Sequence, residues 1–284
     1  MTANCAPATR LYSPYPLSAG ETLTLDAERS HYLTHVLRLQ EGAWLALFHP
    51  QSGEFGARIL TSGKRGTVIR LEACRRPPQP PCLREQEGLW LLPALIKRPR
   101  LELVVEKAVE LGVDRILPVI TRYTDQPRLN PERLQTLAIA AAEQCERLTV
   151  PPVEASRSLS AVLGDWPDGR ALVACVEGGA AAPLAAVAQC SPPGPAGLLI
   201  GPEGGFAPEE RALLAARPNV WLAGLGPRIL RAETAALAAL AVWQAVRGDW
   251  QDTATGQEQR PPFRTPPLLQ ESGAAASDSC TLSR

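Results

Sequence analysis

The hydrophobic pattern of the chain changes its period at a proline cluster, and this change restricts the possible folds more than any other feature. Before the cluster, short strand-like runs at 44–49, 55–60 and 67–73 are separated by glycine-containing turn signals. From residue 88 onward, apolar runs alternate with stretches of helical period. The prolines between 77 and 81 are typical of a semi-rigid linker. The pattern therefore predicts two domains, residues 1–80 and 81–250.

The two parts differ in the architecture they predict. Close-set strands with glycine turns, preceded by a helix that Asp26 can cap, indicate a small barrel in the first part. The alternation in the second part indicates an α/β domain with a mostly parallel sheet. Its expected strands are 88–96, 116–121, 171–176 and 198–200, and its expected helices are 100–111, 131–147, 208–217 and 231–247.

The remaining residues, 251–284, are rich in Pro, Ser, Gln and Ala and carry no amphipathic pattern, so we expect a disordered tail. Elsewhere, with 45% apolar and 20% charged residues, the composition excludes wholesale disorder. The longest unbroken apolar run is the nine residues 235–243. A membrane-spanning helix needs about 20, so we expect no membrane segment. Pro7, Arg10 and Pro14 interrupt the first twenty residues, which argues against a signal peptide.

Cysteine, histidine and charge usage favour a cytoplasmic protein with a polyanionic partner. The seven cysteines are scattered without a C-x-x-C pair, which indicates reduced thiols. The three histidines lack ligand spacing, so no metal site is expected, and Cys145 has no histidine nearby to activate it as a nucleophile. Net charge is zero, yet residues 1–84 hold ten basic and six acidic groups. This excess is a weak indication that one end of the molecule meets a polyanion.

The most informative motif is Gly201-Pro202-Glu203-Gly204-Gly205-Phe206, between a predicted strand and a predicted helix. Glycines permit unusual backbone angles and close approach of a ligand, and the carboxyl end of a strand is where open α/β sheets bind ligands. Carboxylates at 203, 209 and 210 would repel phosphate, so a cationic or neutral ligand fits better. The alternative is a tight turn that binds nothing.

Three further groups of residues have charged side chains that could take part in binding or catalysis. Arg228 and Arg231 flank the entrance to an alanine-rich helix and suggest a lined pocket. Glu143 and Arg147 stand four residues apart and share a helix face, which a solvated ion pair would also explain. Lys97, with Arg98 and Arg100 after it, follows a predicted strand at the expected binding edge.

Taken in order, these blocks resemble the bacterial family that methylates N3 of uridine in small-subunit ribosomal RNA, within the SPOUT class of S-adenosylmethionine enzymes. The resemblance runs from about Arg10 to Arg247. It is carried by His31…Val36-Leu37-Arg38, Lys97, Glu106-Lys107…Glu110-Leu111-Gly112-Val113, Glu143-Gln144…Arg147…Pro151, the glycine motif, and Leu225-Gly226-x-Arg228-Ile229-Leu230-Arg231-x-Glu233-Thr234-Ala235. Ala207 departs from it, because a capping serine or threonine is expected there.

The resemblance implies an N-terminal PUA-like β-barrel that helps to grip RNA and a C-terminal trefoil-knotted α/β domain. It also implies a homodimer with each methyl-donor pocket close to the subunit interface. The implied partner is 16S ribosomal RNA, met in the small ribosomal subunit. The implied cofactor is S-adenosylmethionine, with a pocket formed by Val176, Ile200, Gly201, Glu203, Gly204, Gly205, Leu225, Gly226, Ile229, Leu230 and Thr234.

The chemistry of methyl transfer to uracil N3 suggests roles for the charged residues. Removal of the N3 proton leaves negative charge on the base, which a guanidinium would stabilise; Arg231 is the first candidate and Arg147 the second. Either Glu143 or Glu233 could accept the proton, directly or through water. The expected contacts to the RNA backbone are Arg10, Arg38, Lys97 and Arg98.

Two other functions remain open from the sequence. A non-catalytic RNA-binding or ribosome-assembly protein could keep this fold, but it would be expected to have lost the glycine motif or Arg231. A related methyltransferase acting on ribose or on another base would share the fold and the donor.

Overall fold

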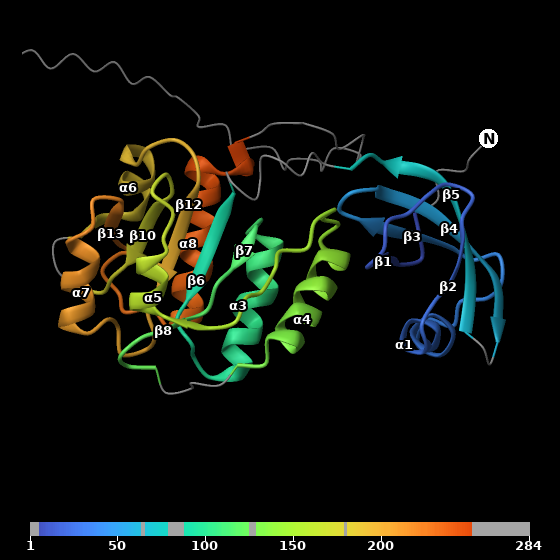
Figure 1. Ribbon diagram of the computed structural model, residues 1–284, viewed down its shortest axis with the longest axis horizontal. Coiled ribbons are helices and arrows are strands. Elements are labelled where there is room, and N and C mark those ends of the chain that lie inside the picture. Colours follow the sequence, from blue (N-terminus) through green and yellow to red (C-terminus); the bar gives the residue numbers. More distant parts are fainter. Residues whose placement is uncertain (1–5, 64–65, 79–87, 125–128, 179–180, 252–284) are drawn as a thin grey trace, which may run out of the picture. The chain divides into compact units, whose positions relative to one another are not determined.

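The computed structural model describes residues 6–63, 66–78, 88–124, 129–178 and 181–251 (Figure 1). The domain boundary expected near residue 80 and nearly all of the expected tail lie outside these residues. In the described part of the chain, no helix is both long and apolar enough to cross a membrane.

The N-terminal strands form one five-stranded sheet in the order β1-β3-β4-β5-β2. β1 (Arg10–Tyr12) pairs in parallel with β3 (Trp44–His49), and the other pairs are antiparallel. Register shifts interrupt the ladder between the long strands β4 (Gly53–Gly63) and β5 (Gly66–Arg76), and such bulges bend a sheet. β2 (Thr22–Thr24) is the other edge strand. The sheet encloses a separate apolar core that includes Leu33, Leu45, Ile59 and Ile69.

A short helical segment packs against this sheet. Asp26 caps α1 (Ala27–His31) as expected, with its carboxylate accepting from the Arg29 backbone N–H at 2.8 Å. The expected single helix to residue 36 instead continues as a π-helical turn, η1 (Tyr32–Val36). Arg38 follows with a φ of 54°, in the left-handed region, which ends the helical segment.

The second sheet is parallel and has the order β11-β13-β10-β12-β6-β7. Its strands are β6 (Leu89–Pro93), β7 (Arg115–Ile116), β10 (Ala171–Cys175), β11 (Ala182–Pro183), β12 (Ala196–Ile200) and β13 (Val220–Gly224). A two-stranded parallel sheet joins β8 (Val119–Ile120) to β9 (Arg157–Ser158). The expected strand 116–121 is therefore two short strands, and β13 was not expected at all.

Successive residues of each strand point to opposite faces of the parallel sheet. Because these residues are apolar on both faces, helices cover both of them. Leu91 and Leu198 pack with α3, α4, α6 and α8, whereas Leu92 and Leu199 pack with α5 and α7. The helices are α3 (Arg98–Glu110), α4 (Pro131–Gln144), α5 (Leu159–Gly164), α6 (Leu184–Cys190), α7 (Pro208–Ala215) and α8 (Ala232–Arg247), followed by the 3-10 turn η2 (Asp249–Gln251). The sequence predicted α3, α4, α7 and α8 and missed the short α5 and α6.

Candidate active site

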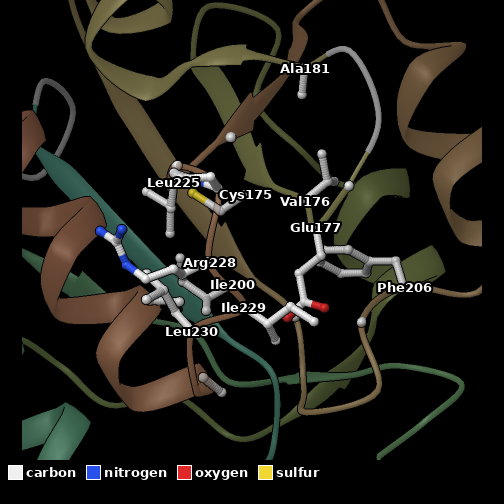
Figure 2. Close-up of a pocket in the computed structure, with 18 of the residues that line it drawn as sticks. Cys175, Val176, Glu177, Ala181, Ile200, Phe206, Leu225, Arg228, Ile229 and Leu230 are labelled. Carbon is white, nitrogen blue, oxygen red and sulfur yellow. The ribbon is translucent and has the colours of Figure 1, made fainter.

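A cavity of about 570 Å³ lies at the carboxyl ends of three neighbouring strands (Figure 2). Cys175 ends β10, Ile200 ends β12 and Gly224 ends β13. The segments that follow these strands form most of the wall, and α8 adds Ala232 and Ala235. Ligand pockets in proteins commonly measure about 300–1,000 Å³. The cavity therefore has the position and size of a small-molecule site.

The two glycine-bearing segments of the sequence meet in this cavity. Gly201 and Gly205 line it from one side, and Gly224 and Gly226 line it from another. Gly205 has a φ of 68° and Gly226 a φ of 100°, and no atom lies within 4 Å of the place where a Cβ would stand at either. Glycine is needed there for the backbone turn, and the same open space lets a ligand reach the main chain.

The cavity wall is mainly apolar. Ile200 is a buried lining residue, and Phe206 packs its ring within 3.1 Å of the Cβ position of Gly201. Leu225 and Leu230 add further apolar surface. Ile229 is 83% exposed at the cavity, which is unusual for a large apolar side chain. Such a surface suits a flat or aliphatic ligand group.

Two charged side chains, Glu177 and Arg228, are among the lining residues. Figure 2 shows the carboxylate of Glu177 reaching past the Phe206 ring toward Ile229, in the middle of the cavity. The guanidinium of Arg228 points to the opposite side. Of the two charged groups, the Glu177 carboxylate is therefore the one placed to contact a ligand bound in the middle of the cavity.

Arg100, at the start of α3, connects two of the segments next to the cavity. Its Nη1 lies 2.9 Å from Oε1 of Glu203 in the glycine motif, and its Nε lies 3.5 Å from Oε1 of Glu233 in the first turn of α8. The other carboxylate oxygen of Glu233, Oε2, is buried and has no hydrogen-bond partner among the described residues. Arg100 thus fixes the two segments relative to each other and leaves Glu233 an open acceptor.

Comparison with known proteins shows the family to which this chain belongs. An RNA methyltransferase domain model matches residues 84–244, and an RNA methyltransferase PUA domain model matches residues 25–72. Ribosomal RNA small subunit methyltransferase E of Rickettsia conorii is 34% identical over 82% of this chain and 93% of that protein. This chain belongs to the ribosomal RNA small subunit methyltransferase E family.

Solved structures agree. The small subunit methyltransferase E of Neisseria gonorrhoeae, bound to S-adenosyl methionine, has a TM-score of 0.74 and 29% identity, covering 85% of this chain and 99% of that one. A Legionella pneumophila protein described as a methyltransferase, in complex with SAM, has a TM-score of 0.71 and 30% identity, covering 84% and 97%. The fold is the SPOUT-type α/β domain preceded by a PUA-like domain, as the resemblance implied.

Most residues proposed for the donor pocket from the methyltransferase E resemblance line the cavity. Those that do are Val176, Ile200, Gly201, Gly205, Leu225, Gly226, Ile229 and Leu230. Glu203, Gly204 and Thr234 are exposed and lie outside the lining. Glu203 is paired with Arg100, and the Cβ position of Gly204 is 3.2 Å from the Tyr123 Cβ.

The four predicted catalytic residues separate into two pairs. Arg231 and Glu233 flank Ala232, which lines the cavity; Arg231 is exposed and is the N-cap residue of α8. Arg147 and Glu143 lie outside the lining. The Arg147 guanidinium donates to the carbonyls of Val109 and Val113 at 3.0 and 2.8 Å, inside the protein. Its position supports a structural role rather than contact with a base in this cavity.

Glu143 is likewise engaged in structure. Its Oε1 accepts from the Tyr12 backbone N–H at 2.8 Å, which links α4 to β1. Burial raises the pKa of this carboxyl above its ordinary value, against the opposing effect of the hydrogen bond. The sequence pattern suggested an exposed pair of Glu143 with Arg147, but the structure gives each residue other partners.

The expected RNA contact at Arg10 is wrong, because its side chain is only 8% exposed. The guanidinium pairs with Glu54, donates to the Ala142 carbonyl at 2.8 Å and stacks 3.6 Å from the centroid of the Phe48 ring. Burial lowers the pKa of Arg10 despite the pairing with Glu54. The other predicted contacts, Arg38, Lys97 and Arg98, are exposed, and Arg98 pairs with Glu102 across one helical turn at 2.8 Å.

Sequence reasoning missed several lining residues, chiefly Cys175 and Glu177. Glu177 could have been found, because it directly follows a predicted strand at the edge where α/β sheets bind ligands. Burial raises the pKa of the Cys175 thiol to about 12, so it is no thiolate nucleophile at neutral pH. The described residues contain no group of His, Cys, Asp or Glu suited to hold a metal.

Proposed function

We propose that this protein is a methyltransferase that transfers a methyl group from S-adenosylmethionine to N3 of a uridine in 16S ribosomal RNA. The observation that carries the proposal is the cavity at the ends of β10, β12 and β13, where the two glycine segments meet. Family membership supports ribosomal RNA of the small subunit as the substrate. The N3 position rests on the sequence resemblance described above.

The residues around the cavity fit S-adenosylmethionine. Apolar side chains of Ile200, Phe206, Leu225 and Leu230 suit an adenine ring and the ribose face. The open glycine backbone at 205 and 226 offers polar main-chain groups without a side chain in the way. Glu177 provides a negative charge for a ligand that carries positive charge. When bound, S-adenosylmethionine supplies an electrophilic methyl group on a sulfonium.

The uracil must lose its N3 proton before it becomes a good nucleophile, and negative charge then develops on O2 and O4. Arg231 is suited to stabilise that charge, because it is exposed and stands in the chain between Leu230 and Ala232, both of which line the cavity. A preorganised donor of this kind contributes about 2.7–4 kcal/mol to transition-state stabilisation. We assign this role to Arg231 rather than to Arg147, whose guanidinium donates to main-chain carbonyls.

Glu233 is the proton acceptor that the geometry favours over Glu143. It belongs to the first turn of α8, beside the cavity-lining Ala232, and its Oε2 has no hydrogen-bond partner among the described residues. Arg100 holds its other oxygen at 3.5 Å. Glu143 is instead bonded to the Tyr12 main chain. A positioned carboxylate can remove the proton directly or through a water molecule.

The RNA substrate has to bind to the surface of the protein so that the target uridine reaches the cavity. Arg38, Lys97 and Arg98 are exposed and remain the proposed contacts with the phosphate backbone. We further propose a cytoplasmic homodimer that acts on the small ribosomal subunit. Membership of the family and the proposed function support these assignments.

The test is an in vitro reaction with small ribosomal subunits from cells that lack the gene and S-adenosylmethionine labelled in its methyl group. After digestion to nucleosides, mass spectrometry should find the label in N3-methyluridine. Label in another base or in a ribose would replace the proposed position with that one. Absence of label together with tight RNA binding would favour the alternative of a non-catalytic RNA-binding or ribosome-assembly protein.

A further inference from the structure

Of the three carboxylates that the sequence suggested would set the charge of the site, Glu209 is exposed and lies outside the cavity lining, and the other two are engaged elsewhere. Glu203 pairs with Arg100 at 2.9 Å. Glu210 accepts from the Ala207 and Arg122 backbone N–H groups at 3.0 and 2.8 Å. Neither residue lines the cavity. The preference for a cationic ligand must therefore come from another group.

Glu177 is placed to provide it. Its main-chain carbonyl accepts from Arg211 Nη1 at 3.2 Å, which ties the segment after β10 to α7. Its carboxylate reaches the middle of the cavity, between Phe206 and Ile229 (Figure 2). Within the described part of the chain it has no ion-pair partner, since the guanidinium of Arg228 points to the other side. The side chain thus presents an unpaired negative charge to the ligand.

We propose that Glu177 makes the cavity prefer the sulfonium donor over its thioether product; this inference rests on the proposed function. The donor and the product S-adenosylhomocysteine share adenine, ribose, ammonium and carboxylate. They differ in one methyl group and in the permanent positive charge on sulfur. A nearby carboxylate in an apolar cavity is attracted to the charged sulfur and gains much less from the neutral one. Loss of that attraction after transfer favours release of the product.

Titration calorimetry with the full chain separates this role from other roles of the same residue. In Glu177→Gln, affinity for S-adenosylmethionine should fall by about tenfold to a hundredfold, the range for a hydrogen bond or contact with a charged group. Affinity for S-adenosylhomocysteine should change by less than about threefold, because only the charged sulfur depends on the carboxylate. Sinefungin, which carries a protonated amine in place of the sulfonium, should follow the donor.

Two variants act as controls. Glu209→Gln removes the same charge from an exposed position in α7 outside the cavity, and both affinities should stay at wild-type values. Glu177→Asp keeps the charge and should retain more of the donor preference than Glu177→Gln. Thermal denaturation of each variant establishes that it is folded.

Equal weakening of donor and product in Glu177→Gln would overturn the inference, because the carboxylate would then bind a group that both ligands share. Unchanged affinity for both would overturn it as well. If the wild-type protein bound neither ligand, the proposed function itself would fall. Wild-type binding together with an unaltered preference would contradict only the role of Glu177.

Discussion

Arg10 Nε and Glu54 Oε2 are 2.7 Å apart in an ion pair whose side chains are 8% and 5% exposed. The same guanidinium donates from Nη1 to Ala142 O and from Nη2 to Arg147 O, at 2.8 and 2.6 Å. One side chain from β1 therefore joins β4 to the end of α4. This contact couples the PUA-like sheet to the methyltransferase domain.

Replacing Arg10 should consequently change the free energy of unfolding rather than a direct contact with RNA. Among the described residues, Arg10→Ala leaves Glu54 paired with Arg75 and Arg76, at 3.3 and 3.5 Å. Breaking a buried pair typically costs about 3–5 kcal/mol, and we expect the lower end of that range in the free energy of unfolding. Urea denaturation measures it. Arg38→Ala, at an exposed position, should change stability by less than about 0.5 kcal/mol; equal stability of the two variants would contradict the account.

Glu143 predicts a pH dependence with a definite sign. Burial raises its pKa above the ordinary 4.5, so between the two pKa values the folded protein binds the proton more tightly than the unfolded chain. Its contribution to stability therefore falls as pH rises through that window and is lowest at neutral pH. The stability of Glu143→Gln relative to wild type should increase from pH 4 to pH 7 in denaturation experiments.

The exposed Glu132→Gln on the same helix is the matched control for this comparison. If Glu143→Gln lost more stability relative to wild type at pH 7 than at pH 4, the carboxylate would be favoured by folding. That result would contradict the direction of the pKa shift.

Replacing Arg147 tests whether this arginine of the family motif stabilises the fold or takes part in catalysis. Its guanidinium bonds Val109 O, Val113 O, Asp114 Oδ1 and Thr149 Oγ1 between 2.8 and 3.3 Å. Arg147→Ala should lower the free energy of unfolding by about 2–4 kcal/mol through unsatisfied buried acceptors. The donor affinity of the folded variant should remain within about twofold of wild type. Full stability combined with lost activity would restore the catalytic assignment.

Arg231 should show the opposite behaviour. Arg231→Ala should leave stability and donor affinity nearly unchanged, because the side chain is exposed and lies outside the lining. Turnover with saturating RNA should fall by about a hundredfold to a thousandfold, the usual effect of losing one charge-stabilising donor. Arg231→Lys keeps the charge and should recover part of the rate. A change confined to KM for RNA would indicate substrate binding instead.

The cavity-lining residues that the sequence predicted carry their signal in the few residues next to them along the chain. The glycines at 201, 205 and 226 lie in the segments that follow β12 and β13, and the turns they form need no long-range information. Arg10 and Arg147 are different, because nothing in their neighbourhood along the chain shows that Glu54 or Val113 will lie beside them. α6 was missed because Leu184–Cys190 is short and rich in alanine, and β13 because Val220–Gly224 lacks alternation. The trefoil knot in the chain is an expectation that only the family resemblance could supply, because no periodicity can indicate it.

The central claim is that the segments after β10, β12 and β13 form the methyl-donor pocket. Calorimetry with S-adenosylmethionine on wild type and on Ala235→Phe tests it most directly, since Ala235 lines the cavity from α8 and the larger ring would fill it. Ala245→Phe, exposed on the same helix, is the control. We predict saturable binding by wild type and the control, and loss of at least about a hundredfold in affinity for Ala235→Phe. Undiminished binding by folded Ala235→Phe would place the donor elsewhere and contradict the account.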